Sequence, residues 1–274
     1  KKLEKSGYNF FSNSDTEVLI AAWDKWGEDA LEHISGMYAF AIWDKSNKKL
    51  TLIRDAYGKK PLFYSVNNNI IAFASDIRSL ENIIDCGDIN PLAVESLFKY
   101  RFIYDPLSIY KNVHKLQPGH IIQFTSDNIE LRKWYNLNSF TDNHDNKAII
   151  HEKLRDYFDR AVKRRLISDV DLGVFLSGGL DSSLIVSSLA EQGYSLPCFT
   201  MGFEGASDYY EERPQAKRLA KYFGMEHQSF EINEKSILNK IPEILNASDE
   251  PFADTSALPF YMLSKEVSSS VKVV

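Results

Sequence analysis

Residues 174–184 combine an apolar strand, a pair of glycines and a helix that begins with Asp and Ser. Glycine lets the backbone approach a ligand closely because it has no Cβ. The first turn of a helix presents unpaired N–H groups and the positive end of the helix dipole, and both favour an anion. The hydroxyl groups of Ser177, Ser182 and Ser183 add hydrogen-bond donors. We therefore predict a phosphate-binding loop at this strand-to-helix turn.

Asp181 lies within this loop, where its negative charge would repel a bare phosphate. A carboxylate beside a phosphate suits a divalent cation between them, so we predict that Asp181 binds Mg²⁺. The loop has no Gly-Lys-Ser/Thr and is therefore not a Walker-type P-loop. The alternative is an ordinary strand-to-helix turn in which Ser and Asp only cap the helix.

The sequence Ser-Gly-Gly-Leu-Asp-Ser-Ser after an apolar strand resembles the PP-loop of the ATP pyrophosphatase superfamily. The resemblance implies that the loop holds the β,γ-phosphates of ATP while a carboxylate is adenylated and pyrophosphate leaves. Residues 200–203, at the end of the next strand, stand where members of the superfamily contact adenine through the backbone. The residues implied in ATP binding are Leu176, Ser177, Gly178, Gly179, Asp181, Ser182, Ser183, Met201 and Gly202.

Residues 249–259 narrow the resemblance to one family. Their sequence Asp-Glu-Pro-Phe-Ala-Asp-Thr-Ser-Ala-Leu-Pro is similar to the motif before the substrate site of glutamine-hydrolysing asparagine synthetases. In that context Asp249, Glu250 and Asp254 would help to organise Mg²⁺, and the alternative is a solvated loop with a helix cap. Asp171 departs from the family, in which proline is usual before the loop strand.

The first part of the chain looks like the later half of a class II glutamine amidotransferase domain. The resemblance implies that Asp15 binds the α-amino group of glutamine, and a carboxylate pairs well with an ammonium group in a partly desolvated pocket. The alternative for Asp15 is a first-turn residue favoured by the helix dipole. Arg54 and Asp55 are predicted to form a structural ion pair. The segments that carry this resemblance are 13–17, 36–41, 54–62 and 74–76.

Class II amidotransferases attack glutamine with an N-terminal cysteine whose α-amino group serves as the base. Lys1 is not that residue, and Cys86 and Cys198 lie in other contexts, so no catalytic residue is predicted. The apolar run 271–274 ends where the family continues into a loop that helps to hold ATP and the acceptor. We therefore expect both ends to be truncated, with no glutaminase activity and weak or no synthetase activity in these 274 residues.

The apolar pattern predicts two domains, 1–140 and 141–274, joined by a polar linker at 139–146. The first is predicted as an α+β domain with an antiparallel sheet, of the Ntn type by resemblance. Ser14 and Glu17 have the spacing of a capping box and predict a helix over 14–34. The predicted strands of this domain are 37–43, 50–53, 62–66, 70–74, 121–124 and 131–134.

Residues 141–274 alternate helical and strand patterns, which is typical of an α/β domain with a parallel sheet covered by helices on both faces. By resemblance this is the PP-loop fold. Strands are predicted at 173–176, 197–203, 226–232 and 271–274, and helices at 182–192, 211–223, 235–245 and 257–268.

Composition excludes several classes of protein. The chain is 44% hydrophobic and 26% charged, with a net charge of −6, which argues against nucleic acid or an acidic membrane as a partner. The two cysteines exclude a disulfide scaffold and suit a reducing cytoplasm. No apolar run approaches the ~20 residues of a membrane span. His144 and His151 lack the spacing of a zinc site.

The resemblance covers nearly the whole chain and implies a cytoplasmic ligase of the glutamine-hydrolysing asparagine synthetase family, which uses ATP and Mg²⁺. It would convert aspartate, glutamine and ATP into asparagine, glutamate, AMP and pyrophosphate through a β-aspartyl adenylate. One alternative is a related amidotransferase with another carboxylate acceptor, such as a cell-surface sugar or a β-lactam precursor. Another is a non-catalytic remnant that only binds nucleotide. A homodimer is compatible with the sequence, which does not define the oligomeric state.

Overall fold

The computed structural model of the chain describes residues 1–67, 70–137, 146–205 and 211–274. The predicted linker lies outside the described residues except for Asn146, so the predicted domain boundary stays a prediction. Contacts within the chain define two compact units. The segment Val94–Ile103 groups with the second unit, which was not predicted. The units are Lys1–Ala93 with Tyr104–Leu137, and Val94–Ile103 with Asn138–Val274.

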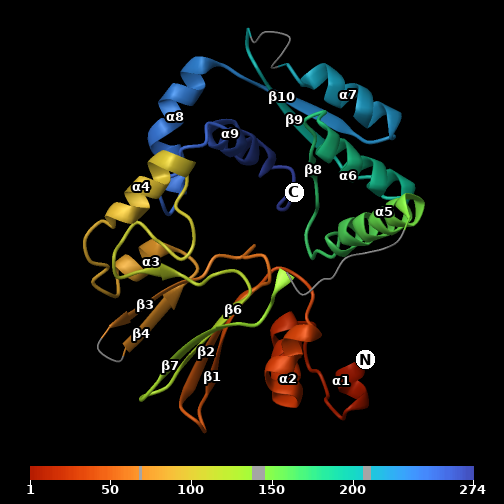
Figure 1. The fold of residues 1–274 in the computed structure, drawn as a ribbon. Coiled ribbons are helices and arrows are strands. Elements are labelled where there is room, and N and C mark those ends of the chain that lie inside the picture. The colour runs from red at the N-terminus through yellow and green to blue at the C-terminus, as the bar shows by residue number, and fades with distance from the viewer. Residues whose placement is uncertain (68–69, 138–145, 206–210) are drawn as a thin grey trace. The chain divides into compact units, whose positions relative to one another are not determined.

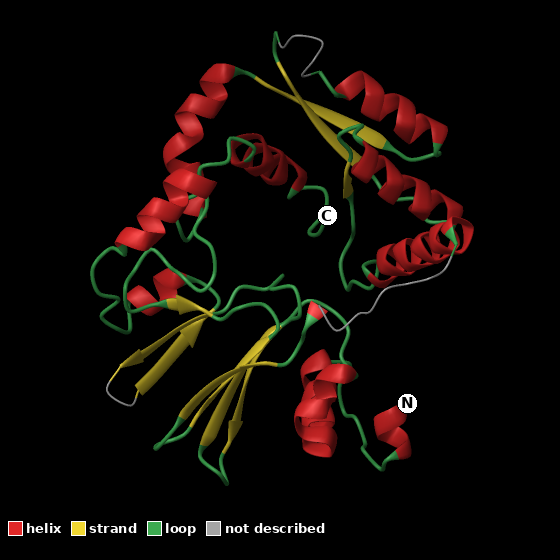
Figure 2. Cartoon of the chain, viewed as in Figure 1, coloured by secondary structure: helices red, strands yellow, loops and turns green. Residues whose placement is uncertain are grey.

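The first unit contains short helices and two antiparallel sheets (Figures 1 and 2). The predicted helix over 14–34 is too long, because Gly27 adopts a positive φ of 56° and the chain continues as a tighter 3₁₀ helix. The helices are α1 (Lys2–Lys5), α2 (Asp15–Trp26), the 3₁₀ helix η1 (Gly27–Glu32) and α3 (Ile77–Glu81); α4 (Pro91–Tyr100) begins in this unit and runs into the second.

Helix α2 begins where the capping signal predicts, but with different partners. The Ser14 hydroxyl accepts a hydrogen bond from the Thr16 N–H at 3.2 Å. The Glu17 carboxylate accepts from the N–H groups of Phe11 and Ser12, each at 2.9 Å, whereas a capping box would use the N–H of Ser14. Glu17 therefore ties the preceding loop to the helix.

Both sheets of the first unit are antiparallel, which confirms the predicted sheet type. Alternate residues of one strand face opposite sides, so that Leu52 and Ile53 enter two different apolar clusters. The sheets have the orders β1-β2-β6-β7 and β4-β3-β5. The strands are β1 (Ala39–Asp44), β2 (Lys49–Arg54), β3 (Phe63–Asn67), β4 (Ile70–Ala74), β5 (His114–Lys115), β6 (His120–Phe124) and β7 (Ile129–Lys133).

The second unit is built on a parallel sheet of order β10-β9-β8 (Figure 1). The predicted strand over 271–274 is reduced to a single parallel bridge between Val273 and Leu172. The strands are β8 (Val174–Phe175), β9 (Cys198–Phe203) and β10 (His227–Ile232). The helices are α5 (Lys147–Arg164), α6 (Leu180–Glu191), α7 (Arg213–Tyr222), α8 (Glu234–Ala247) and α9 (Ala257–Val267).

Helices cover both faces of this parallel sheet, as predicted. Val186 of α6 and Ala216 of α7 pack with Val174 and Cys198 on one face. Leu263 of α9 packs with other sheet residues on the opposite face. Within the described ranges, no helix is both long enough and apolar enough to cross a membrane.

Candidate functional site

The loop between β8 and α6 has the backbone that a phosphate-binding turn requires. Gly178 has a φ of +84°, and a Cβ built there would lie 2.7 Å from Cγ of Gln215, so the position needs glycine. Gly179 precedes the helix in an extended conformation and supplies no capping side chain. The N-terminus of α6 is therefore not occupied by a side-chain cap and stays accessible to an anion.

The three serines of the sequence motif converge on Gly179. The hydroxyls of Ser177 and Ser182 lie 3.0 Å apart, and Ser177 Oγ accepts from the Gly179 N–H at 3.2 Å. Ser182 and Ser183 both donate their hydroxyls to the Gly179 carbonyl, at 3.2 Å and 2.6 Å. Ser182 and Ser183 thus both stabilise the first turn of α6.

The parallel register brings the second sequence motif to the same edge of the sheet. Phe175 pairs with Phe199, so the residues after β8 leave the sheet beside Met201 and Gly202. The Met201 side chain packs into the apolar cluster beneath α9. Gly202 is buried, and a Cβ there would collide with the Arg213 side chain.

Asp181 is exposed in the first turn of α6, and the described part of the chain records no hydrogen bond or ion pair for its carboxylate. Asp254 accepts the Ser256 N–H at 2.9 Å, and this bond holds the pKa of Asp254 below its ordinary value. Among the described residues, no group of three or more His, Cys, Asp or Glu side chains could hold a metal ion. The structure thus does not gather three of the carboxylates Asp181, Asp249, Glu250 and Asp254 at one metal site.

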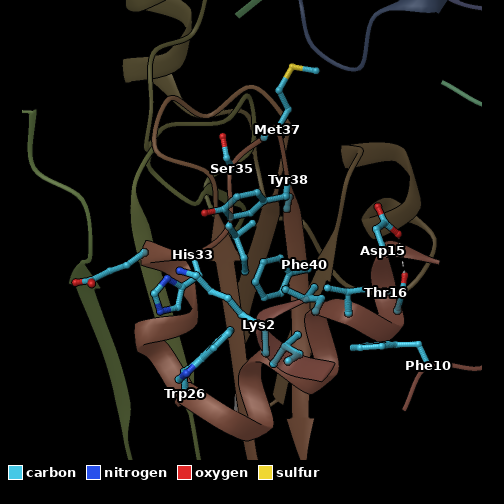
Figure 3. Close-up of a pocket in the computed structure, with 18 of the residues that line it drawn as sticks. Lys2, Phe10, Asp15, Thr16, Trp26, His33, Ser35, Met37, Tyr38 and Phe40 are labelled. Atoms are coloured by element: carbon cyan, nitrogen blue, oxygen red, sulfur yellow. Dashed lines mark hydrogen bonds between the residues drawn. The ribbon is translucent and has the colours of Figure 1, made fainter. Parts of the chain in front are cut away.

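A separate pocket of about 1430 Å³ lies in the first unit (Figure 3). Asp15 and Thr16 line one side of it and Trp26 and His33 another, as Figure 3 shows. Asp15 is exposed, and the described ranges record no ion pair for it. An unpaired carboxylate at the rim of a pocket can bind a ligand ammonium group. Other lining residues are Asn13, Ser35, Gly36, Tyr38, Phe40, Lys60, Pro61 and Ser75.

Asp55 organises the loop that supplies part of this pocket's wall. Its carboxylate is 2% exposed and accepts four backbone hydrogen bonds, from Tyr38 at 3.2 Å, Tyr57 at 3.1 Å, and Lys59 and Lys60 at 3.0 Å each. Burial by itself raises the pKa of Asp55, but the four N–H donors outweigh it and lower the pKa below its ordinary value.

The predicted Arg54–Asp55 ion pair is wrong. Arg54, 8% exposed, instead pairs with Asp105 at 2.8 Å, because Asp55 turns its carboxylate toward backbone N–H groups. Sequence reasoning missed Asp105, since no local spacing links two residues 51 positions apart. The same guanidinium donates to three backbone carbonyls, those of Lys60 at 2.9 Å, Gly58 at 3.0 Å and Leu116 at 2.6 Å.

The Asp55 carboxylate should make the free energy of unfolding of the first unit depend on pH in the acidic range. Because its folded pKa is lowered, its contribution is fully present above the unfolded pKa of about 4 and is lost as the pH falls through the folded value. We expect the stability difference between wild type and Asp55→Asn to be constant from pH 7 to about pH 5 and to shrink below it. Urea unfolding at successive pH values measures this, and a difference that does not change with pH would contradict it.

Comparison with known proteins adds to this geometry. Residues 1–135 match a family model described as glutamine amidotransferase domain, and residues 153–274 match one described as asparagine synthase. The chain is 34% identical over 273 residues to asparagine synthetase (glutamine-hydrolyzing) 1 of Bacillus subtilis. The aligned region covers 100% of this chain and 43% of that protein.

Two further relatives have similar coverage. A provisionally named asparagine synthetase (glutamine-hydrolyzing) 2 of Methanocaldococcus jannaschii is 36% identical over 278 residues, 99% of this chain and 53% of that protein. Amidase chry2 of Gibberella zeae is 28% identical over 278 residues, 95% of this chain and 41% of that protein. The chain spans about half the length of the curated relatives it matches.

Proposed function

We propose that the chain serves glutamine-dependent, ATP-driven amide synthesis, because residues 1–135 match the glutamine amidotransferase domain model and residues 153–274 match the asparagine synthase model. The whole protein would use aspartate, glutamine and ATP and release asparagine, glutamate, AMP and pyrophosphate. The observation that carries the proposal is the convergence of Ser177, Gly178 and Gly202 at one edge of the parallel sheet.

We further propose that the first domain, 1–140, has the Ntn type of fold and the second, 141–274, the PP-loop type. The antiparallel sheets of the first unit and the parallel β10-β9-β8 sheet of the second support this assignment. The loop after β8 would then receive the β,γ-phosphates of ATP, with Leu176, Ser182 and the N-terminus of α6 around them. The backbone of Met201 and Gly202 would contact the adenine.

The chemistry follows from where the loop holds the nucleotide. A β-carboxylate oxygen of aspartate attacks the α-phosphorus of ATP, the bond to the bridging oxygen breaks, and pyrophosphate leaves. Donors held by the loop at the β,γ-phosphates stabilise the charge that grows on this leaving group. Ammonia then displaces AMP from the acyl carbon and loses a proton to give the amide. Bound Mg²⁺, held by Asp181, would neutralise part of the triphosphate charge.

Asp15 is proposed to bind the α-ammonium group of glutamine in the pocket of the first unit. Its carboxylate lines the pocket and has no recorded cation partner among the described residues. The Thr16 hydroxyl lies 3.4 Å from Asp15 Oδ1, at the outer limit of a hydrogen bond, so the carboxylate keeps its capacity to accept from a ligand. Cleavage of glutamine itself is assigned to no residue of this chain.

The acceptor is the part of the proposal that needs a direct experiment. The full-length protein should be incubated with ATP, Mg²⁺, glutamine and a panel of carboxylates, and the amide products identified by mass spectrometry. Formation of asparagine together with AMP supports the proposal. Amide formation on another carboxylate would favour the alternative amidotransferase, for which the similarity to a fungal amidase is the supporting observation. Absence of any AMP release would indicate a chain that only binds nucleotide.

Asp181→Asn tests the proposed metal role. The asparagine keeps the size of the side chain but removes its charge, so we expect ATP to bind about fivefold to tenfold more weakly with Mg²⁺ present, a loss of about 1–1.4 kcal/mol. Without Mg²⁺ the variant should bind ATP as well as wild type or better, because a like charge has been removed. Calorimetric titrations with and without Mg²⁺ measure both. Equal Mg²⁺–ATP affinity in the two proteins would remove Asp181 from this role.

A further inference from the structure

A buried hydroxyl lies directly beneath the proposed phosphate loop. Thr200 of β9 is 2% exposed, and its Oγ1 lies 2.5 Å from the carbonyl oxygen of Leu176 and 2.9 Å from Nε2 of His227. Leu176 is 1% exposed and directly precedes Ser177. The last buried carbonyl before the loop is therefore held by the side chain of a neighbouring strand.

This contact stands at the point where the chain leaves the sheet. Strand β8 ends at Phe175, and the Leu176 N–H still donates to the Phe199 carbonyl at 2.9 Å. The Thr200 hydroxyl donates a hydrogen bond to the Leu176 carbonyl. Two residues after Leu176 the chain turns at Gly178, which has a positive φ. A buried carbonyl that loses a hydrogen-bond donor is destabilised, so the departure point of the loop depends on this hydroxyl.

The hydrogen atoms in this chain of bonds have one consistent arrangement. A carbonyl oxygen only accepts, so the single hydroxyl hydrogen of Thr200 points to Leu176. The lone pair of Thr200 Oγ1 then accepts from His227, whose Nε2 must carry a hydrogen. Burial lowers the pKa of His227, with the Lys217 charge adding to the effect, so near neutral pH the ring is neutral with its hydrogen on Nε2.

We propose that Thr200, oriented by His227, is a positioning residue that holds the phosphate loop in the geometry that binds ATP. Neither side chain needs to touch the nucleotide. The hydroxyl sets the position of Leu176, and thereby where Ser177 and the glycines begin. The inference rests on the proposed ATP-binding function of the loop.

Thr200→Val tests the positioning role, because valine has the shape of threonine but no hydroxyl. Titration of the full chain with Mg²⁺–ATP should show about tenfold or weaker binding, while Thr200→Ser should stay within about twofold of wild type. The matched control is Ser188→Ala, which removes another buried hydroxyl of the same unit, one that donates to Asp159 at 2.5 Å. If Thr200→Val does not fold, His227→Phe tests the same chain of bonds, with about threefold weaker binding expected.

Imidazole ¹⁵N resonances provide a readout that a loss of stability would not produce. Wild-type His227 should show the Nε2–H tautomer, and Thr200→Val should lose that preference. If Thr200→Val binds ATP as tightly as wild type, the positioning role is overturned, and the same holds for His227→Phe where that variant is used. A loss of ATP affinity in Ser188→Ala as large as in Thr200→Val also overturns it. A wild-type chain that does not bind Mg²⁺–ATP would overturn the proposed function of the loop and the positioning role with it.

Discussion

Arg54→Met is expected to lower the free energy of unfolding of the first unit by about 3–5 kcal/mol, the range seen when one partner of a buried ion pair is removed. The substitution leaves the Asp105 carboxylate without its cation partner, and it removes the donors to the carbonyls of Lys60, Gly58 and Leu116. Arg54→Lys keeps the charge but cannot bind all four groups at once, so its loss should be smaller.

Urea unfolding followed by tryptophan fluorescence measures this effect selectively. All four tryptophans, at positions 23, 26, 43 and 134, lie in the first unit. Lys111→Met is the matched control, because Lys111 pairs with Asp88 on the surface of the same unit, where the two side chains are 49% and 85% exposed. An exposed pair contributes at most about 1 kcal/mol. A loss in Arg54→Met no larger than in the control would contradict the structural role of Arg54.

Gly178→Val is expected to weaken Mg²⁺–ATP binding at least 30-fold, about 2 kcal/mol. Two costs add at this position. A β-branched residue at a φ of +84° is strained, and the new Cβ would lie 2.7 Å from Cγ of Gln215 and 3.3 Å from the Ala216 nitrogen. The backbone therefore has to shift, and this loop is the proposed ligand site.

Gly193→Val separates the loss of binding from general strain. Gly193 lies after α6 in the same unit with a φ of +80°, and a Cβ there would meet no atom within 4 Å. Both variants should lose thermal stability, but only Gly178→Val should lose ATP affinity in calorimetric titration. If Gly193→Val binds ATP as weakly as Gly178→Val, the effect is one of stability, and the loop has no particular role.

The sequence alone determined the parts of this protein that depend on near neighbours. The strand, Gly-Gly turn and helix around residues 174–184 could be predicted because the glycines, the serines and the helix start lie within a few positions of one another. The antiparallel hairpins and the Ser14 cap of α2 are local in the same sense. Gly27 was also a local signal, for the end of a helix, and the prediction of one helix over 14–34 wrongly ignored it.

Tertiary structure decided which distant groups meet. Arg54 pairs with Asp105 rather than with its neighbour Asp55 because four backbone N–H groups already bind the Asp55 carboxylate. Thr200 reaches Leu176 only because β8 and β9 pair in one register, and a shift of one residue would turn the hydroxyl to the other face of the sheet. The residues of the loop lie within a few positions of one another, so the sequence alone can indicate them. The contact of Thr200 with Leu176, which supports the loop, exists only once the strands have paired.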